Sequence, residues 1–131
     1  MTAVVGLSSD ALIDRPRMEA VHAEMSGPVF EPALKEVVRQ LWKLAREVLE
    51  AERVEVLRRR LKQITVIADR FGLKAVRACA QAIADASAGR DKDDFPAPQT
   101  EELWERLRDA LWETQALIES GQVAQEVSQA A

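Results

Sequence analysis

The chain has 131 residues, of which 47% are apolar and 31% charged, and its formal net charge is −4. This length and balance fit one globular domain, and the negative charge argues against nucleic-acid binding. The single histidine and single cysteine exclude an internal disulfide and the usual His/Cys zinc site.

We expect a short helix after the first eight residues, split into two pieces by Pro16. Either Ser9 or Asp10 can cap its first turn. Its apolar positions are Leu12, Ile13, Met18, Val21 and Met25. A Ser-Gly-Pro run then ends the segment, so residues 1–29 form an N-terminal helical extension.

Two helical patterns follow. The first begins at Pro32, which suits the first turn of a helix, and extends to about residue 52. The second covers residues 54–71, and the short break between the two predicts a tight turn and antiparallel neighbours. Gly72 comes directly after the second pattern and is a natural C-terminal cap.

A third helix is expected over residues 73–88. The polar segment 90–99 contains two prolines and predicts a loop. Thr100 then caps a last helix, which ends at Gly121. We expect residues 121–131 to form a flexible tail.

These patterns predict an all-α fold. Four amphipathic helices with short connections favour an antiparallel, up-down four-helix bundle over residues 30–120, with an additional N-terminal helix against it. No apolar run is long enough to cross a membrane, and the N-terminus lacks the features of a signal peptide. We therefore expect a cytoplasmic protein that has no membrane, metal or cofactor partner.

Residues 57–86 carry a more specific pattern. The turn Phe71, Gly72, Leu73 joins two helices, and core-spaced residues follow it at Val76, Cys79 and Ile83. This hairpin resembles the centre of histidine-phosphotransfer (HPt) domains, the four-helix intermediates of bacterial phosphorelays, and residues 34–49 fit the first helix of that bundle. The resemblance covers about residues 30–119 and implies an HPt-like bundle.

The residues that carry chemistry in that family differ here. The resemblance implies an exposed histidine ten residues before Gly72, a lysine three residues after the histidine, and a glycine after that lysine. Those positions hold Lys62, Thr65 and Val66. A protonated lysine amine has no lone pair with which to attack an aspartyl phosphate. The sole histidine, His22, lies outside the hairpin, in the N-terminal segment.

The position of Lys62 lies on one face of its helix. At about 100° per residue, Lys62 and Val66 fall opposite the apolar stripe, and Lys74 and Arg77 add positive charge nearby. This candidate docking face consists of Arg58, Arg59, Lys62, Thr65, Val66, Asp69 and Arg70. It suits the acidic phosphorylation site of a receiver domain, and the alternative interpretation is an ordinary solvated basic face.

The single cysteine and the three tryptophans are further candidates for core or interface positions. Cys79 is expected to be a small buried residue between helices, and Trp42 and Trp104 lie at the edges of their apolar stripes. Trp112 falls well off the stripe of its helix. It either packs against the N-terminal segment or is an anchor for a partner.

The leading hypothesis is a non-catalytic HPt-like signalling module. It would bind the receiver domain of a response regulator, or another two-component signalling protein, without accepting phosphate. A homodimer is compatible with this interpretation. One alternative is a structural or oligomerising helical bundle unrelated to phosphorelays, and a second is an active phosphotransfer protein that uses His22.

Overall fold

The computed structural model describes residues 9–25, 27–87 and 100–130. In these parts of the chain it contains seven helices and no strand, which confirms the predicted all-α class. The predicted loop over residues 90–99 lies outside the described residues. Among the residues that are described, no helix combines the length and the hydropathy needed to cross a membrane.

Two short helices, α1 (Ser9–Leu12) and α2 (Arg15–Glu24), begin the described chain. The predicted two pieces are present, but the break lies at residues 13–14 and Pro16 is in the first turn of α2, where a proline is tolerated. The cap of α2 is Asp14, whose carboxylate accepts a hydrogen bond from the backbone N–H of Arg17 at 3.3 Å.

Helix α3 (Gly27–Glu50) begins earlier than the sequence pattern predicts. The expected start was Pro32, but this proline is exposed inside the helix, where it removes only the hydrogen bond to the carbonyl of Pro28. The first turn contains Phe30, which is buried. Burial of this aromatic ring favours the extra turn over a start at the proline.

Helices α4 (Val54–Arg70) and α5 (Lys74–Ser87) form a hairpin. Gly72 ends α4 with a positive φ of 72°. The N–H of Leu73 donates to the carbonyl of Ala68 at 2.8 Å, and the N–H of Gly72 donates to that of Asp69 at 3.3 Å. These two bonds form a Schellman motif, so the predicted role of Gly72 as a C-terminal cap is confirmed.

Helices α6 (Thr100–Glu119) and α7 (Gln122–Ala130) complete the described chain. The prediction of a flexible tail after residue 120 is wrong, because α7 is helical and buries Val123 and Val127. Two valines in a short polar segment are a weak signal in sequence. Their burial depends on helices that lie elsewhere in the chain.

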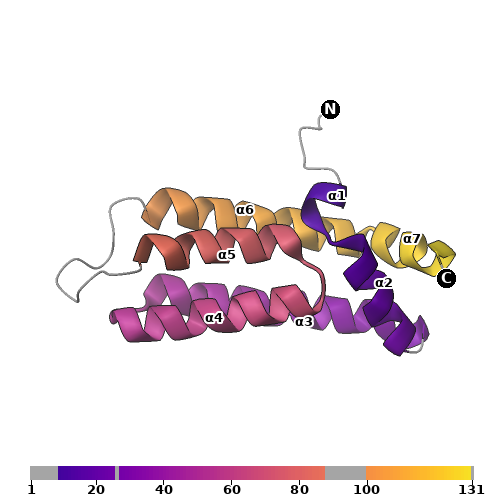
Figure 1. Ribbon diagram of the computed structural model, residues 1–131, viewed down its shortest axis with the longest axis horizontal. Coiled ribbons are helices and arrows are strands. Elements are labelled where there is room, and N and C mark those ends of the chain that lie inside the picture. Colours follow the sequence, from indigo (N-terminus) through magenta and orange to yellow (C-terminus); the bar gives the residue numbers. More distant parts are fainter. Residues whose placement is uncertain (1–8, 26, 88–99, 131) are drawn as a thin grey trace.

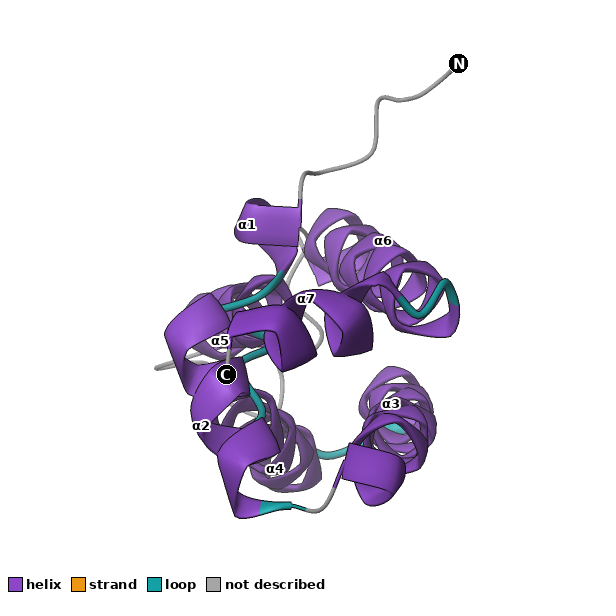
Figure 2. Ribbon diagram, turned by 90° about the vertical axis from the view of Figure 1, so that its right-hand side faces the viewer, coloured by secondary structure: helices purple, strands orange, loops and turns teal. Residues whose placement is uncertain are grey.

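The four long helices lie side by side, and consecutive ones run in opposite directions (Figure 1). Helix α4 packs against α3 and α5, and α6 packs against the same two helices. Viewed end-on, α4 and α6 therefore lie at opposite corners (Figure 2). The short helices gather at one end, where α2 packs against α7 and α1 packs against α5 and α6. Buried side chains from long and short helices alike form one core.

Candidate functional site

The candidate docking face lies on the side of α4 that points away from the core. The buried side of this helix carries Val54, Leu57, Leu61, Ile64 and Ala68. On the opposite side Lys62 is exposed and Val66 is 58% exposed. All residues of the face other than the half-buried Thr65 are exposed, so the structure places the predicted set on one open surface.

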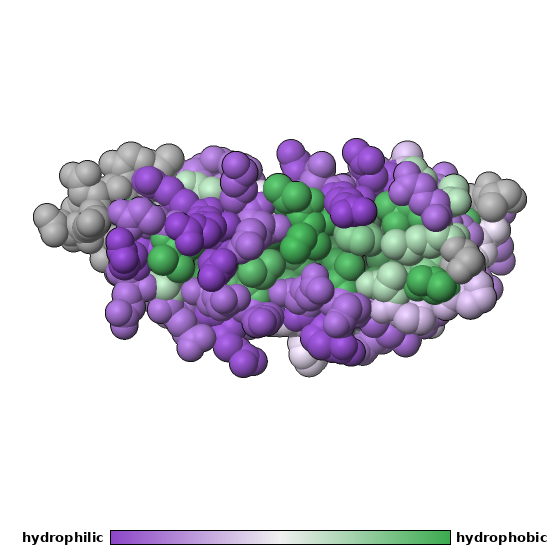
Figure 3. Space-filling view, turned by 90° about the horizontal axis from the view of Figure 1, so that it is seen from below, coloured by the Kyte–Doolittle hydropathy of each residue, from purple (hydrophilic) through white to green (hydrophobic). Residues whose placement is uncertain are grey.

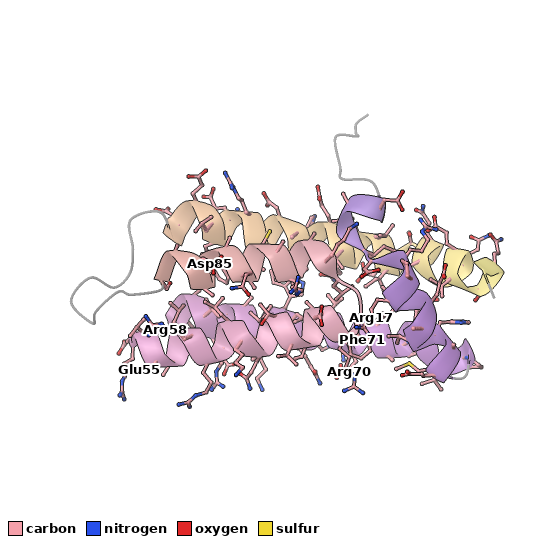
Figure 4. The ribbon with its side chains drawn as sticks, in the orientation of Figure 1. Arg17, Glu55, Arg58, Arg70, Phe71 and Asp85 are labelled. Carbon is pink, nitrogen blue, oxygen red and sulfur yellow. The ribbon has the colours of Figure 1, made fainter. Side chains whose placement is uncertain are left out.

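One edge of this face is already engaged by α5. The Arg58 guanidinium donates a hydrogen bond to the carbonyl of Ser87 at 2.9 Å, at the C-terminal end of α5, where a cation is favoured. The Asp69 carboxylate lies 3.4 Å from Nε of Arg77. Figure 4 shows Arg58 at the end of the hairpin far from Arg70 and Phe71. Arg58 and Asp69 therefore hold α4 to α5 and are not the open centre of the face.

The centre of the face is open and positively charged. Among the described residues, neither Arg59 nor Lys62 has a side-chain hydrogen bond or an ion pair with any other. Both line a shallow hollow together with Gln63, Val66 and Ile67. Figure 3, which views the molecule from the side of α3 and α4, shows apolar surface between hydrophilic side chains. Within the described part of the chain, the exposed Val66 thus lies beside two cations that have no partner.

Lys62, Thr65 and Val66, the positions singled out by the resemblance, lie together on α4. Lys62 is exposed on the face, and nothing buries its ammonium group. The Thr65 hydroxyl donates to the carbonyl of Lys62 at 2.8 Å, so it is used within the helix. Val66 adds an apolar side chain beside them. No nucleophile of the usual phosphoacceptor type stands at these three positions.

His22 lies on α2, outside this face. Its ring packs edge-on against Phe30, with 4.9 Å between ring centroids and 82° between planes. Its Nε2 atom lies 3.4 Å from Oγ of Ser128, on α7. The histidine therefore contributes to packing between α2, α3 and α7.

Cys79 is half-buried, and its thiol lies 3.6 Å from the backbone carbonyl of Arg106. Burial raises the pKa of this thiol, the charge of Arg106 lowers it and that of Asp109 raises it. A raised pKa leaves little thiolate at neutral pH, so Cys79 is not suited to nucleophilic chemistry. The structure agrees with the expected packing role, although burial is only partial.

The three tryptophans differ in their surroundings. Trp42 and Trp104 are half-buried at the edge of the core, as the sequence predicts. The indole N–H of Trp42 donates to Oε1 of Gln115 at 2.8 Å, which joins α3 to α6. Trp112 is 67% exposed on the outer side of α6. The short helices α1 and α2 therefore do not cover it.

Acidic side chains lie on the same side of α6 as Trp112, and the sequence analysis missed them. The exposed residues Glu101, Glu105 and Asp109 lie on the same side of α6. Their spacing of about four residues puts them on one helix face, and that periodicity is the signal by which they could have been found. Among the described residues, no group of three or more His, Cys, Asp or Glu could hold a metal ion.

Comparisons of the chain with protein-family models, with curated proteins and with solved structures found no match. The functional argument therefore depends on the surfaces of this molecule. These are the basic face of α4 and the tryptophan-centred face of α6.

Proposed function

We propose that this chain is an HPt-like antiparallel four-helix bundle that binds a receiver domain through α4 and does not accept phosphate. The observation that carries the proposal is the open centre of the α4 face. There Val66 is 58% exposed between cations that have no partner in the described chain. Contiguous apolar surface with a charged rim marks many interaction sites, and here Val66 and the half-buried Ile67 supply the apolar part.

The arrangement of the long helices supports the proposal. Each of the helices α3 to α6 packs against two of the other three, and α4 and α5 pack together most extensively. The turn at Gly72 lies ten residues after Lys62, as the resemblance requires. The position that corresponds to the family's phosphohistidine is therefore exposed at the middle of the proposed docking helix.

Charge supports a receiver domain as the partner. Receiver domains carry a cluster of acidic side chains at their phosphorylation site, and the cations around Val66 have the opposite sign. Such complementarity chiefly raises the association rate and selects the partner. Added salt should therefore weaken the complex.

Two features support the absence of phosphate transfer. The amine of an exposed lysine is protonated at neutral pH and is a poor nucleophile. Val66 occupies the position at which the family has glycine, so its side chain keeps the partner's backbone from a close approach. The face can bind a receiver and yet lack the group that would accept phosphate.

The test mixes the purified chain with receiver domains encoded in the same genome, phosphorylated and unphosphorylated. We expect at least one receiver to bind and no phosphate to appear on this chain. Lys62→Glu should weaken binding at least tenfold, because the variant places a carboxylate against the acidic site. Lys43→Glu is the matched control, since Lys43 is exposed on α3 and lies outside the face.

Any one of three results would overturn the proposal or a part of it. Stable phosphate on the chain would show that transfer occurs, and His22→Ala would then show whether the histidine of α2 is the acceptor. Failure of every receiver to bind would remove the docking role. Equal loss of binding in the Lys62 and Lys43 variants would show that the α4 face is not the site.

A further inference from the structure

The outer face of α6 is acidic, and no other element of the described chain covers its centre. Trp112 lies at its centre and is 67% exposed. Among the described residues, the exposed carboxylates of Glu101, Glu105 and Asp109 have no ion-pair partner. Two cations lie near them in the sequence, Arg108 and Arg106, and the latter pairs with Glu102. Exposed tryptophans contribute strongly to binding when a partner covers them. This face therefore fits a partner that offers apolar surface and positive charge.

The face of α4 offers apolar surface and positive charge. Val66 is its apolar centre, and the cations Arg59 and Lys62 lie beside it. Helices α4 and α6 occupy opposite corners of the molecule (Figure 2), so their outer faces point away from each other. One copy of the chain cannot join its own two faces, but a second copy can.

We propose that the α6 face of one copy binds the α4 face of another copy, in a head-to-tail contact. Helices α4 and α6 run in the same direction in the molecule (Figure 1). A second copy that is shifted sideways without rotation therefore brings its α6 alongside α4 in parallel. This simple shift juxtaposes basic and acidic faces with no rearrangement of either molecule.

The spacing of the side chains agrees with this placement. With Trp112 opposite Val66, Lys62 lies four residues before the valine and Asp109 lies three residues before the tryptophan. Arg59 and Glu105 each lie seven residues before the same centres. Seven helical residues span about 10.5 Å, so both cations lie opposite a carboxylate along the paired helices.

The contact is small. It joins one helix to one helix, and such a contact buries less than the roughly 1,200 Å² that stable interfaces bury. We therefore expect weak, reversible association that is seen at high protein concentration and low salt. Because the two faces differ, each dimer keeps one free α4 face and one free α6 face, and further copies can add to form open chains.

The association does not depend on the proposed function. If the chain also binds a receiver through α4, a second copy and the receiver compete for Val66 and Lys62. Self-association would then reduce receiver binding as the concentration rises. That consequence alone rests on the receiver proposal.

The test is sedimentation velocity of the full chain, with no receiver present. We expect the average mass to rise with concentration at low salt and to return to that of the monomer at high salt. Lys62→Glu disables the α4 face and Trp112→Ala disables the α6 face, so each variant alone should be monomeric. Lys43→Glu on α3 is the control and should associate as the wild type does.

A mixture of the two variants gives the sharpest result. Lys62→Glu keeps an intact α6 face and Trp112→Ala keeps an intact α4 face, so the mixture should form dimers and no longer chains. A wild-type chain that stays monomeric, a single variant that still associates, or a monomeric mixture would each overturn the proposal. If either variant loses the wild-type circular dichroism spectrum, Lys62→Gln or Trp112→Gln replaces it. Since no receiver is present, this test can fail while the receiver proposal stands.

Discussion

Gly72 links the end of α4 to the N-terminal helices. Its φ of 72° lies in the left-handed region that the Schellman motif requires. A Cβ added here would lie 2.9 Å from the backbone oxygen of Asp14 and 3.3 Å from Cβ of Arg17. The carbonyl of Gly72 also accepts a hydrogen bond from the N–H of Asp14 at 2.7 Å. The glycine therefore ends one helix and allows the segment between α1 and α2 to approach closely.

A pair of glycine substitutions separates these two effects. Gly121 has a φ of 79° but nothing within 4 Å of an added Cβ. We expect Gly121→Ala to lower the free energy of unfolding by about 1–2 kcal/mol, the cost of a left-handed L-residue. Gly72→Ala should cost about 1 kcal/mol more, because it also displaces Asp14 and weakens a hydrogen bond. Urea denaturation measures both values, and equal losses would show that the contact with Asp14 contributes nothing.

Helices α2 and α7, which come from opposite ends of the described chain, form one packed unit. Arg15 of α2 makes an ion pair with Glu126 of α7, with 3.2 Å between Nη1 and Oε2. Val123 and Val127 of α7 are buried in the common core. The two helices therefore stabilise each other at one end of the molecule, and α7 is an integral part of the fold.

A substitution in α7 tests this role. Val127→Ala should lower the free energy of unfolding by about 2 kcal/mol, from two lost methyl groups and the cavity that they leave. Gln125→Ala is the control, because Gln125 lies on the exposed side of the same helix. Its effect should stay within about 0.5 kcal/mol. Chemical denaturation checks both variants. A Val127 variant as stable as its control would indicate that α7 does not pack as described.

At the scale of the whole molecule, a single core joins the long helices to the short ones. Leu12 of α1 and Val127 of α7 belong to the same buried cluster as Leu107 of α6. Small domains with one core usually unfold in a single cooperative step. The two outer faces proposed for binding lie outside this core, on opposite sides of the molecule. Substitutions on those faces should therefore change binding and leave unfolding nearly unchanged.

Two spectroscopic probes test the single core. The three tryptophans lie in α3 and α6, so fluorescence reports on the long helices, whereas far-ultraviolet circular dichroism reports on every helix. We expect the two urea transitions to coincide, because α1, α2 and α7 share the core. Loss of helical signal at lower urea than the fluorescence change would show that the short helices unfold separately. Val127→Ala should shift both transitions together.

Much of the fold and part of the site follow from local patterns in the sequence. Apolar spacing correctly predicts helices close to α4 and α5, and it places Lys62 and Val66 on the exposed side. Gly72 is recognisable as a cap because positive φ strongly favours glycine. These features depend on residues within a few turns of each other, so the sequence by itself determines them.

Only the tertiary structure decides which side chains stay exposed and which are buried or hydrogen-bonded. Arg58 belongs to the predicted face, yet it bonds to Ser87 because α5 ends beside it. Val127 is buried because α7 meets helices from distant parts of the chain, and Trp112 stays exposed because α1 and α2 pack elsewhere. The physical reason is the same in each case. Periodicity shows which side of a helix is apolar, but burial and hydrogen bonding depend on the neighbour that the fold brings to that side.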